Sequence, residues 1–153
     1  MSVVGFDFGT TNSLISIITG NKAIDFLDDN GLPVPSVVCY EGSKKIVGRE
    51  AKERLGSAGL GIKGNVVRSP KIFLDQESVY IEGVKRAPVD IVRDVVQYVA
   101  KQACLRRSTP LSDISQAVVT IPVNTDGRWR AALRDSFRLA GISIVQFVHE
   151  PLA

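Results

Sequence analysis

The chain has 153 residues, of which 44% are hydrophobic and 23% are charged, as in an ordinary soluble globular domain. Its formal net charge is +3, and Lys and Arg are interleaved with Asp and Glu, which excludes a nucleic-acid-binding stripe and a polybasic membrane patch. No apolar run approaches a membrane span and no signal peptide precedes the first predicted strand, so we expect a cytoplasmic protein. Cys39 and Cys104 lack metal-ligand spacing and are expected to be buried reduced thiols.

An apolar strand over residues 3–8 is expected to lead into a tight turn. The turn reads Asp7-Phe8-Gly9-Thr10-Thr11-Asn12-Ser13, and a second apolar run over residues 14–18 follows it. Gly9 can open to positive φ, and successive amides of such a turn form a concavity that binds anions, usually phosphate. Asp7 would repel phosphate directly but suits a place beside a divalent cation or its water shell. The residues alone leave an ordinary hairpin, with Asp7 and Gly9 as turn formers, equally open.

Short strands fill the next part of the chain. They are predicted over residues 22–27, 36–40 and 44–47, with a short helix over residues 50–55. Residues 59–64 spell G-x-G-x-x-G, but they follow a helix rather than a strand. We therefore interpret them as a mobile connector and not as a dinucleotide site. Lys71, in the stretch that follows, reads by itself as a solvated loop lysine.

The C-terminal half alternates helices with strands. A small hairpin is predicted over residues 80–85, and a helix runs from Pro88 to about Leu105. The apolar face of this helix consists of Ile91, Val92, Val95, Val99 and Ala103. Residues 116–122 predict a central strand buried on both faces, and residues 144–148 predict another buried strand. A helix over residues 126–140 lies between them, which predicts right-handed crossover units over a mixed sheet.

Several of these stretches together resemble the heat shock protein 70 (DnaK-like) chaperones. The turn carries the order D-x-G-T-T-N-S of the first phosphate motif of actin-like ATPases, and sugar kinases of the same superfamily carry a looser version. Further matches are the P-S-V-V and V-G-x-x-A landmarks at residues 35–38 and 47–51 and the V-T-V-P pattern at residues 119–122. The patterns R-x-A-G and N-E-P-T-A have counterparts at residues 138–141 and 149–153. The resemblance covers essentially the whole chain.

The resemblance implies an α/β fold, namely the first lobe of an actin-like (ribonuclease H-like) ATPase domain. Such a lobe has a mixed β-sheet with flanking helices and a smaller inserted subdomain. Residues 1–34 and 106–153 would form the core sheet subdomain, and residues 35–105 the inserted subdomain with its connecting helix. The second phosphate motif, D-x-G-G-G-T, does not occur in the sequence. We therefore expect the second lobe and the substrate-binding domain to be absent, and the chain alone to be inactive although its parent protein would hydrolyse ATP.

The resemblance also implies ATP or ADP with Mg²⁺ as cofactors. The residues that would hold the phosphates are Gly9, Thr10, Thr11 and Asn12. Asp7 would order the magnesium ion through water, and Lys71 would stabilise charge on the transferred phosphoryl group. Glu150 would bind a water or a metal ligand opposite Asp7; by itself it reads as a carboxylate at a strand end.

Two further positions, Pro122 and Arg130, match residues that couple the nucleotide state to the substrate domain in these chaperones. Without the resemblance, Pro122 is a strand terminator and Arg130 a surface charge. Gln146 stands where DnaK-type proteins often have an Arg that meets the J-domain co-chaperone. We therefore expect stimulation by a generic J-domain to be weak.

The function implied is ATP binding within a chaperone that couples ATP hydrolysis to the binding and release of unfolded polypeptide. Its partners would be unfolded polypeptides, bound through the absent substrate domain, a J-domain co-chaperone and a nucleotide exchange factor. Neither nucleic acid nor a membrane is expected as a partner. Two alternatives stay open: a small-molecule kinase on the same fold, and a non-enzymatic actin-like assembly or regulatory module.

Overall fold

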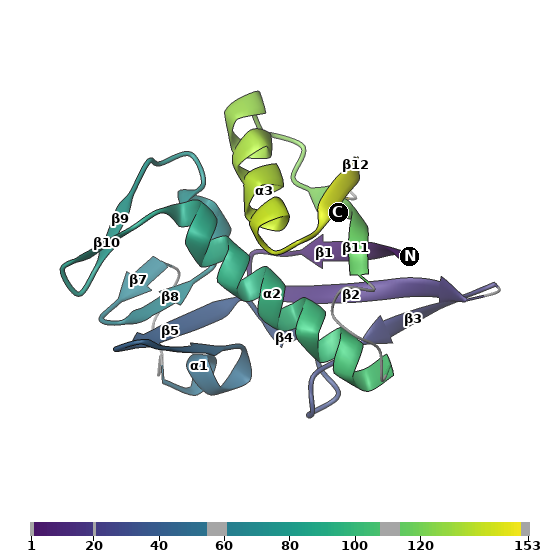
Figure 1. Cartoon of the computed structure of the whole chain (residues 1–153), viewed down its shortest axis with the longest axis horizontal. Coiled ribbons are helices and arrows are strands. Elements are labelled where there is room, and N and C mark those ends of the chain that lie inside the picture. Colours follow the sequence, from purple (N-terminus) through teal and green to yellow (C-terminus); the bar gives the residue numbers. More distant parts are fainter. Residues whose placement is uncertain (1, 20, 55–60, 108–113, 151–153) are drawn as a thin grey trace.

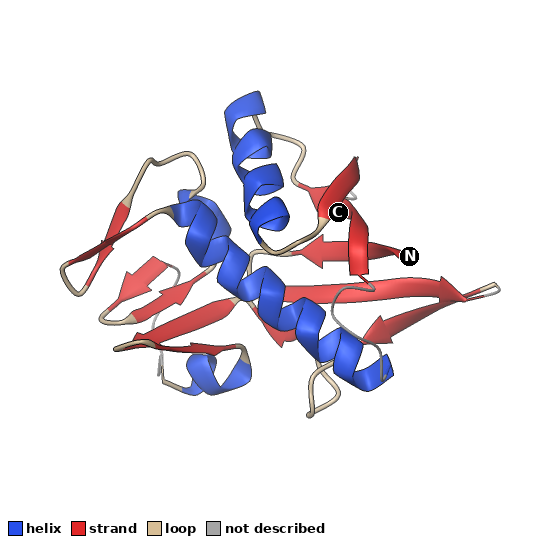
Figure 2. Ribbon diagram, viewed as in Figure 1, coloured by secondary structure: helices blue, strands red, loops and turns tan. Residues whose placement is uncertain are grey.

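The fold is built on two main β-sheets and a two-stranded hairpin, and one long helix packs against both main sheets (Figures 1 and 2). The computed structural model describes residues 2–19, 21–54, 61–107 and 114–150. The strands of the larger sheet are β1 (Ser2–Phe8), β2 (Asn12–Thr19), β3 (Lys22–Phe26), β4 (Val34–Pro35), β11 (Ile114–Ile121) and β12 (Ser143–His149). Their order is β12-β11-β1-β2-β3, with β4 paired to β2. The pairs β1/β11 and β11/β12 are parallel and the others antiparallel, so the sheet is mixed, as predicted.

The smaller sheet has four antiparallel strands in the order β6-β5-β8-β7. Its strands are β5 (Val37–Glu41), β6 (Lys44–Val47), β7 (Gly61–Lys63) and β8 (Val66–Arg68). The predicted hairpin is confirmed as β9 (Val79–Ile81) and β10 (Val84–Arg86). The helices are α1 (Arg49–Glu53), α2 (Pro88–Arg107), α3 (Gly127–Leu139) and the 3₁₀-helix η1 (Pro70–Phe73). None of the helices in the described residues combines the length and hydropathy that crossing a bilayer requires.

Helix α2 runs diagonally past both sheets and contributes the centre of the hydrophobic core (Figure 1). The predicted apolar face is confirmed, since each of its members is at most 2% exposed: Ile91, Val92, Val95, Val99 and Ala103. Helix α3 packs beside α2 on the larger sheet through Phe137, whose ring lies edge-on to Phe6 at 5.0 Å and to Phe8 at 6.4 Å between centroids. This aromatic cluster fixes α3 over β1.

A buried polar network joins α2 to the smaller sheet. Asp94 of α2 is 5% exposed, accepts a 2.7 Å hydrogen bond from the Tyr40 hydroxyl and lies 3.1 Å from the Lys45 ammonium. Burial and the Asp94 charge raise the pKa of the Tyr40 phenol, so Tyr40 remains a neutral donor. Because a buried carboxylate needs such partners, these contacts set how the smaller sheet sits against α2.

Two predictions about the C-terminal strands are wrong. Within the described residues β12 is an edge strand that pairs with β11 alone, and Val145 and Val148 are 48% and 41% exposed instead of buried. In β11 buried residues alternate with half-buried ones, because the helices α2 and α3 cover only one face of the larger sheet. The apolar runs therefore predicted the positions of the strands correctly. They did not predict burial, because fewer elements pack against these strands than the apolar content suggested.

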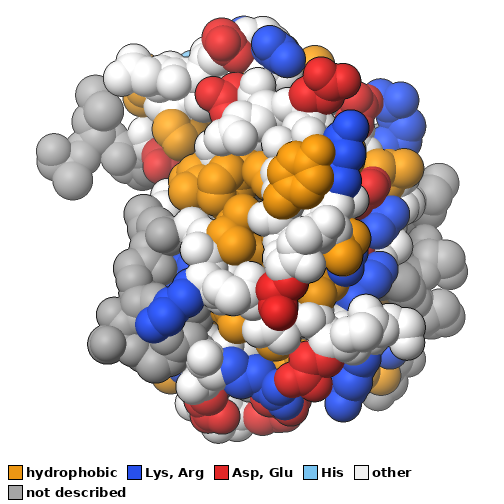
Figure 3. Space-filling model, turned by 90° about the vertical axis from the view of Figure 1, so that its left-hand side faces the viewer, with side chains coloured by type: hydrophobic (Ala, Val, Ile, Leu, Met, Phe, Trp, Pro, Cys, Tyr) orange, Lys and Arg blue, Asp and Glu red, His pale blue; other side chains and the backbone are white. Residues whose placement is uncertain are grey.

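The interpretation of residues 59–64 as a connector needs correction as well. Residues 61–63 form β7, an edge strand of the smaller sheet that pairs with β8, whereas residues 59 and 60 lie outside the described part. The rejected dinucleotide motif is thus partly an ordinary antiparallel strand. Cys39 and Cys104 are both buried, as expected. Figure 3 shows the end of the molecule that carries the smaller sheet and the hairpin, where apolar side chains gather amid interspersed charges of both signs.

Candidate phosphate-binding site

The turn between β1 and β2 is held by a hydrogen bond from the Gly9 amide to the Asn12 carbonyl, 2.9 Å long. Gly9 does not adopt the left-handed backbone that its residue type suggested. Its requirement is different: a Cβ at this position would lie 2.7 Å from the Asn12 carbonyl oxygen, a distance that real Cβ atoms essentially never show. Close approach of two backbone segments therefore explains the glycine. Thr10, Thr11 and Asn12 are exposed at the tip of the turn.

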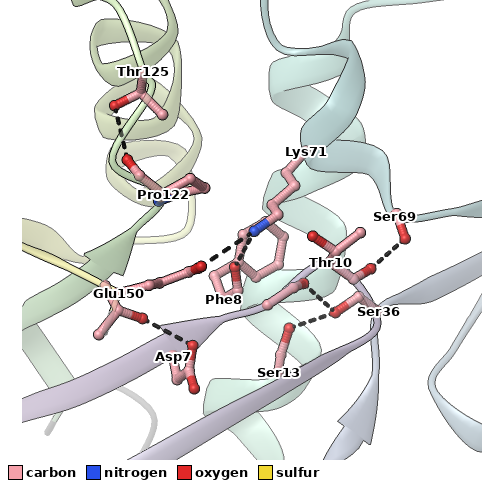
Figure 4. Close-up of polar contacts among 12 residues, drawn as sticks. Asp7, Phe8, Thr10, Ser13, Ser36, Ser69, Lys71, Pro122, Thr125 and Glu150 are labelled. Atoms are coloured by element: carbon pink, nitrogen blue, oxygen red, sulfur yellow. Dashed lines mark hydrogen bonds and ion pairs between the residues drawn. The ribbon is translucent and has the colours of Figure 1, made fainter. Parts of the chain in front are cut away.

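Asp7 stands on β1 two residues before the turn and is exposed. Its Oδ1 accepts a 2.8 Å hydrogen bond from the Thr120 hydroxyl (Figure 4). The two residues are register partners in the parallel pair of β1 and β11, so their side chains project from the same face of the sheet. Thr120 thus orients a carboxylate that remains accessible from outside.

Lys71 is buried, with its side chain 6% exposed, so the reading as a solvated loop lysine is wrong. It lies on η1, and its ammonium reaches across to β1, where it donates a 3.1 Å hydrogen bond to the Phe8 carbonyl (Figure 4). Burial lowers the pKa of the Lys71 ammonium, whereas the charges of Glu150 and Asp7 oppose that shift. The Trp129 indole donates to the Lys71 carbonyl at 3.1 Å and so anchors the backbone of η1 to α3.

Glu150 follows β12 and is tied to the end of β11 by its amide, which donates to the Ile121 carbonyl at 2.7 Å. Its Oε1 lies 3.7 Å from the Lys71 ammonium, and its side chain is 38% exposed. Two carboxylates and one ammonium from three separate elements therefore meet beside the turn: Asp7, Lys71 and Glu150. The structure brings these three predicted residues together with the four residues of the turn.

A cleft of about 320 Å³ opens next to this cluster. Its lining comes from the turn, η1, the loop after β11 and the start of α3, and consists of Thr10, Lys71, Ile72, Asp75, Pro122, Asn124, Thr125, Asp126 and Trp129. Arg130 does not line the cleft. Its guanidinium donates to the Thr125 carbonyl at 2.6 Å, and the Thr125 hydroxyl in turn donates to the Pro122 carbonyl at 3.4 Å. Pro122 and Arg130 thus belong to one hydrogen-bonded loop at the rim of the cleft.

Four residues that shape the site were not singled out from the sequence: Ser36, Ser69, Thr120 and Trp129. Ser36 and Thr120 lie within the P-S-V-V and V-T-V-P patterns, so the patterns contained a usable signal. Ser69 precedes a proline and Trp129 lies on the inward face of a helix, and neither position by itself indicates contact with the turn.

A mixed sheet with a tight turn after its first strand, flanked by helices and a smaller sheet, is consistent with the lobe of an actin-like ATPase. The sequence profile described as "Hsp70 protein" matches residues 3–59. Two relatives named "Chaperone protein DnaK" are 31% identical over 99% of the chain in Mycoplasma mycoides and 30% identical over 98% in Deinococcus deserti. A "Chaperone protein HscA homolog" of Burkholderia thailandensis is 33% identical over 98%.

The chain belongs to the heat shock protein 70 family and corresponds to the N-terminal lobe of the family's actin-like ATPase domain. It spans about a quarter of the length of these relatives, 24% and 27% for the two DnaK proteins and 27% for the HscA homolog. Membership of this family implies nucleotide binding.

Proposed function

We propose that this chain binds the phosphates of ATP or ADP, together with Mg²⁺, in the cleft beside the Gly9–Asn12 turn. In the complete protein this site would support ATP hydrolysis coupled to the binding and release of unfolded polypeptide. The observation that carries the proposal is the buried Lys71 ammonium, which lies against the turn with Glu150 at 3.7 Å. A phosphate group needs such a cation, and a magnesium ion needs carboxylates or their bound water nearby.

The donor set of the site fits a nucleotide phosphate with its metal. The amides and hydroxyls at Thr10, Thr11 and Asn12 would hold the phosphate oxygens, since exposed amides of a tight turn attract anions. Asp7, oriented by Thr120, would hold the water shell of the magnesium ion. When bound, the metal ion supplies neutralisation of the charge that develops on the phosphates.

Lys71 has two partners among the described residues, the Phe8 carbonyl and the Glu150 carboxylate. These partners compensate the cost of burying an ammonium without a phosphate. A phosphate in the cleft would be a stronger partner for Lys71, and it would leave Glu150 to orient a water molecule. Glu150 is thus the counterion of Lys71 in this structure and would be a positioning group beside a bound phosphate.

The other expectations from the resemblance extend this proposal. Pro122 and Arg130 would couple the nucleotide state to a substrate-binding domain, which is supported by the hydrogen bonds that join them through Thr125. Partners of the complete protein would be unfolded polypeptides, a J-domain co-chaperone and a nucleotide exchange factor, in the cytoplasm. We also propose the division into a core part, about residues 1–34 and 106–153, and an inserted part, about residues 35–105.

The test is an NMR titration of the ¹⁵N-labelled chain with ADP, with and without Mg²⁺. We expect the amide signals of Thr10, Thr11 and Asn12 to shift, and Mg²⁺ to strengthen the binding. Asp7→Asn should abolish the strengthening by Mg²⁺, because an amide does not replace a carboxylate beside a cation. Asp25→Asn, which removes an exposed carboxylate from β3, is the matched control and should behave as the unmodified chain. Equal Mg²⁺ dependence in both variants would contradict the proposed site.

A further inference from the structure

Three successive carbonyl groups of the turn are hydrogen-bonded by two serines that lie at the ends of strands of the smaller sheet. The Gly9 carbonyl accepts a 3.2 Å hydrogen bond from the Ser36 hydroxyl, and the Thr11 carbonyl accepts a 3.0 Å bond from the Ser36 amide. The Thr10 carbonyl between them accepts a hydrogen bond from the Ser69 hydroxyl. We call Ser36 and Ser69 the serine clamp (Figure 4).

The serine clamp is itself a connected unit with little freedom. Both serines are 0% exposed, and the Ser69 amide donates to the Ser36 carbonyl at 2.9 Å. The Ser36 hydroxyl also lies 2.8 Å from that of Ser13 at the start of β2. Ser36 stands between β4 and β5 and Ser69 directly after β8, so the neighbouring strands β5 and β8 hold them side by side. A hydroxyl buried here has few alternative partners, which keeps it on the turn.

Ser69 adopts a left-handed backbone, with φ 60° and ψ 58°. A residue with a Cβ resists this conformation, so the surrounding contacts must impose it. The conformation turns the chain from β8 into η1, which places the Ser69 hydroxyl on the Thr10 carbonyl and starts the helix that carries Lys71. Ser69 therefore determines both the position of the turn and the direction in which η1 brings Lys71 to it.

We propose that the serine clamp positions the phosphate turn by fixing the direction of its amide groups. In a trans peptide the carbonyl of one residue and the amide of the next point to opposite sides, and no cis peptide bond occurs in the described residues. Carbonyls 9, 10 and 11 point at the clamp, so amides 10, 11 and 12 point away from it, towards the exposed side of the turn. Ser36 and Ser69 are thus positioning residues that act on phosphate through the backbone, and this inference rests on the proposed phosphate site.

The first experiment measures the turn without any ligand. Backbone ¹⁵N relaxation of the full chain should give order parameters for residues 10–12 near those of rigid backbone, about 0.85. Ser36→Ala removes the hydroxyl donor of the Gly9 carbonyl and leaves the bond from the Ser36 amide to the Thr11 carbonyl, whereas Ser69→Ala removes the donor of the Thr10 carbonyl. Each variant should lower the order parameters, and the double variant Ser36→Ala/Ser69→Ala should bring them below about 0.6. Ser69→Gly removes the hydroxyl and also relieves the left-handed strain, so it serves if Ser69→Ala does not fold. The matched control is Ser136→Ala, which removes another fully buried serine, whose hydroxyl donates to the Ala132 carbonyl of its own helix at 3.0 Å.

The second experiment titrates the same variants with inorganic pyrophosphate and follows amides 10–12. We expect the clamp variants to bind about tenfold more weakly than the unmodified chain, and Ser136→Ala to bind equally well. Unchanged order parameters in the clamp variants would overturn the proposal, whatever the titration gives. A fall in order parameters together with no shift of these amides in the unmodified chain would retain the clamp and refute the proposed phosphate site. Equal weakening in Ser136→Ala would also overturn the proposal, since it would reduce the effect to a general loss of stability.

Discussion

Replacing Gly9 with Ala tests whether close approach, rather than backbone conformation, determines the turn. The new Cβ would lie 2.7 Å from the Asn12 carbonyl oxygen and would have to move about 0.7 Å to reach 3.4 Å, where ordinary contact begins. The Gly9–Asn12 hydrogen bond, now 2.9 Å long, would be stretched past the usual range by such a shift. Its loss costs about 1 kcal/mol, and the residual strain of a displaced turn costs about as much again. We therefore expect Gly9→Ala to lower the free energy of unfolding by about 2 kcal/mol.

For a chain of this size, that loss corresponds to a fall in Tm of roughly 4–8 °C, which a thermal melt followed by circular dichroism resolves. The control is Gly127→Ala at the start of α3, where a Cβ would meet no atom within 4 Å apart from its chain neighbours and the adjacent backbone of its own helix. Alanine favours a helix over glycine, so this variant should be as stable as the unmodified chain or slightly more stable. If Gly9→Ala had the same Tm as Gly127→Ala, the argument from close approach would be refuted.

Three further outcomes follow from contacts elsewhere in the fold. Asp28 is partly buried, which raises the pKa of its carboxyl, but the hydrogen bond from Arg49 at 2.8 Å and two backbone amides lower the pKa below its usual range. The stabilising effect of the Asp28 carboxylate is therefore present above its unfolded-state pKa and is lost as the pH falls through its folded-state pKa. Asp28→Asn should destabilise the chain at pH 7 by about 1 kcal/mol and should weaken the acid dependence of Tm between pH 5 and 3. An unchanged acid dependence would contradict this. Phe137→Ala should cost about 3–5 kcal/mol in urea unfolding, because the fully buried ring packs on two other aromatic rings, and a loss under 1 kcal/mol would show that the cluster does not hold α3. Thr120→Val preserves the shape of the side chain but removes the donor to Asp7, so it should weaken Mg²⁺-dependent ADP binding more than Mg²⁺-independent binding, and an equal effect on both would contradict the orienting role.

The sequence predicted the parts of the fold that depend on periodicity and on turn residues. The apolar spacing of α2 and the hairpin of β9 and β10 are confirmed, because their side-chain patterns are local. The exposure of β12 was not predictable, since an apolar strand has the same sequence whether it lies inside a sheet or at its edge. Burial depends on neighbouring elements from any part of a chain, and the local sequence pattern of one strand carries no information about how many such elements pack on it.

The candidate site divides in the same way. The sequence motif indicated Asp7 and the residues of the turn, and the family resemblance added Lys71 and Glu150. The structure places Lys71 and Glu150 beside Asp7 and the turn. The residues that bind the carbonyl groups of the turn, such as Ser36, come from segments distant in sequence and contact the turn through individual hydrogen bonds. No local pattern distinguishes a serine that binds a carbonyl 27 residues away from one that caps a turn.

The arrangement of α2 has a consequence for how the molecule unfolds. One helix supplies the inner wall for strands of both sheets and also contacts η1 and α3, so detachment of α2 opens the main core that both sheets share, and only the separate cluster between α1 and the smaller sheet stays covered. The two sheets should therefore open in a single cooperative event, and amide protons of β2 and β5 should exchange with solvent at similar free energies. A loosening at the Asp94 network would be transmitted along the helix to β2, the strand that begins at the Gly9–Asn12 turn, which makes α2 the mechanical link between the two halves of the molecule.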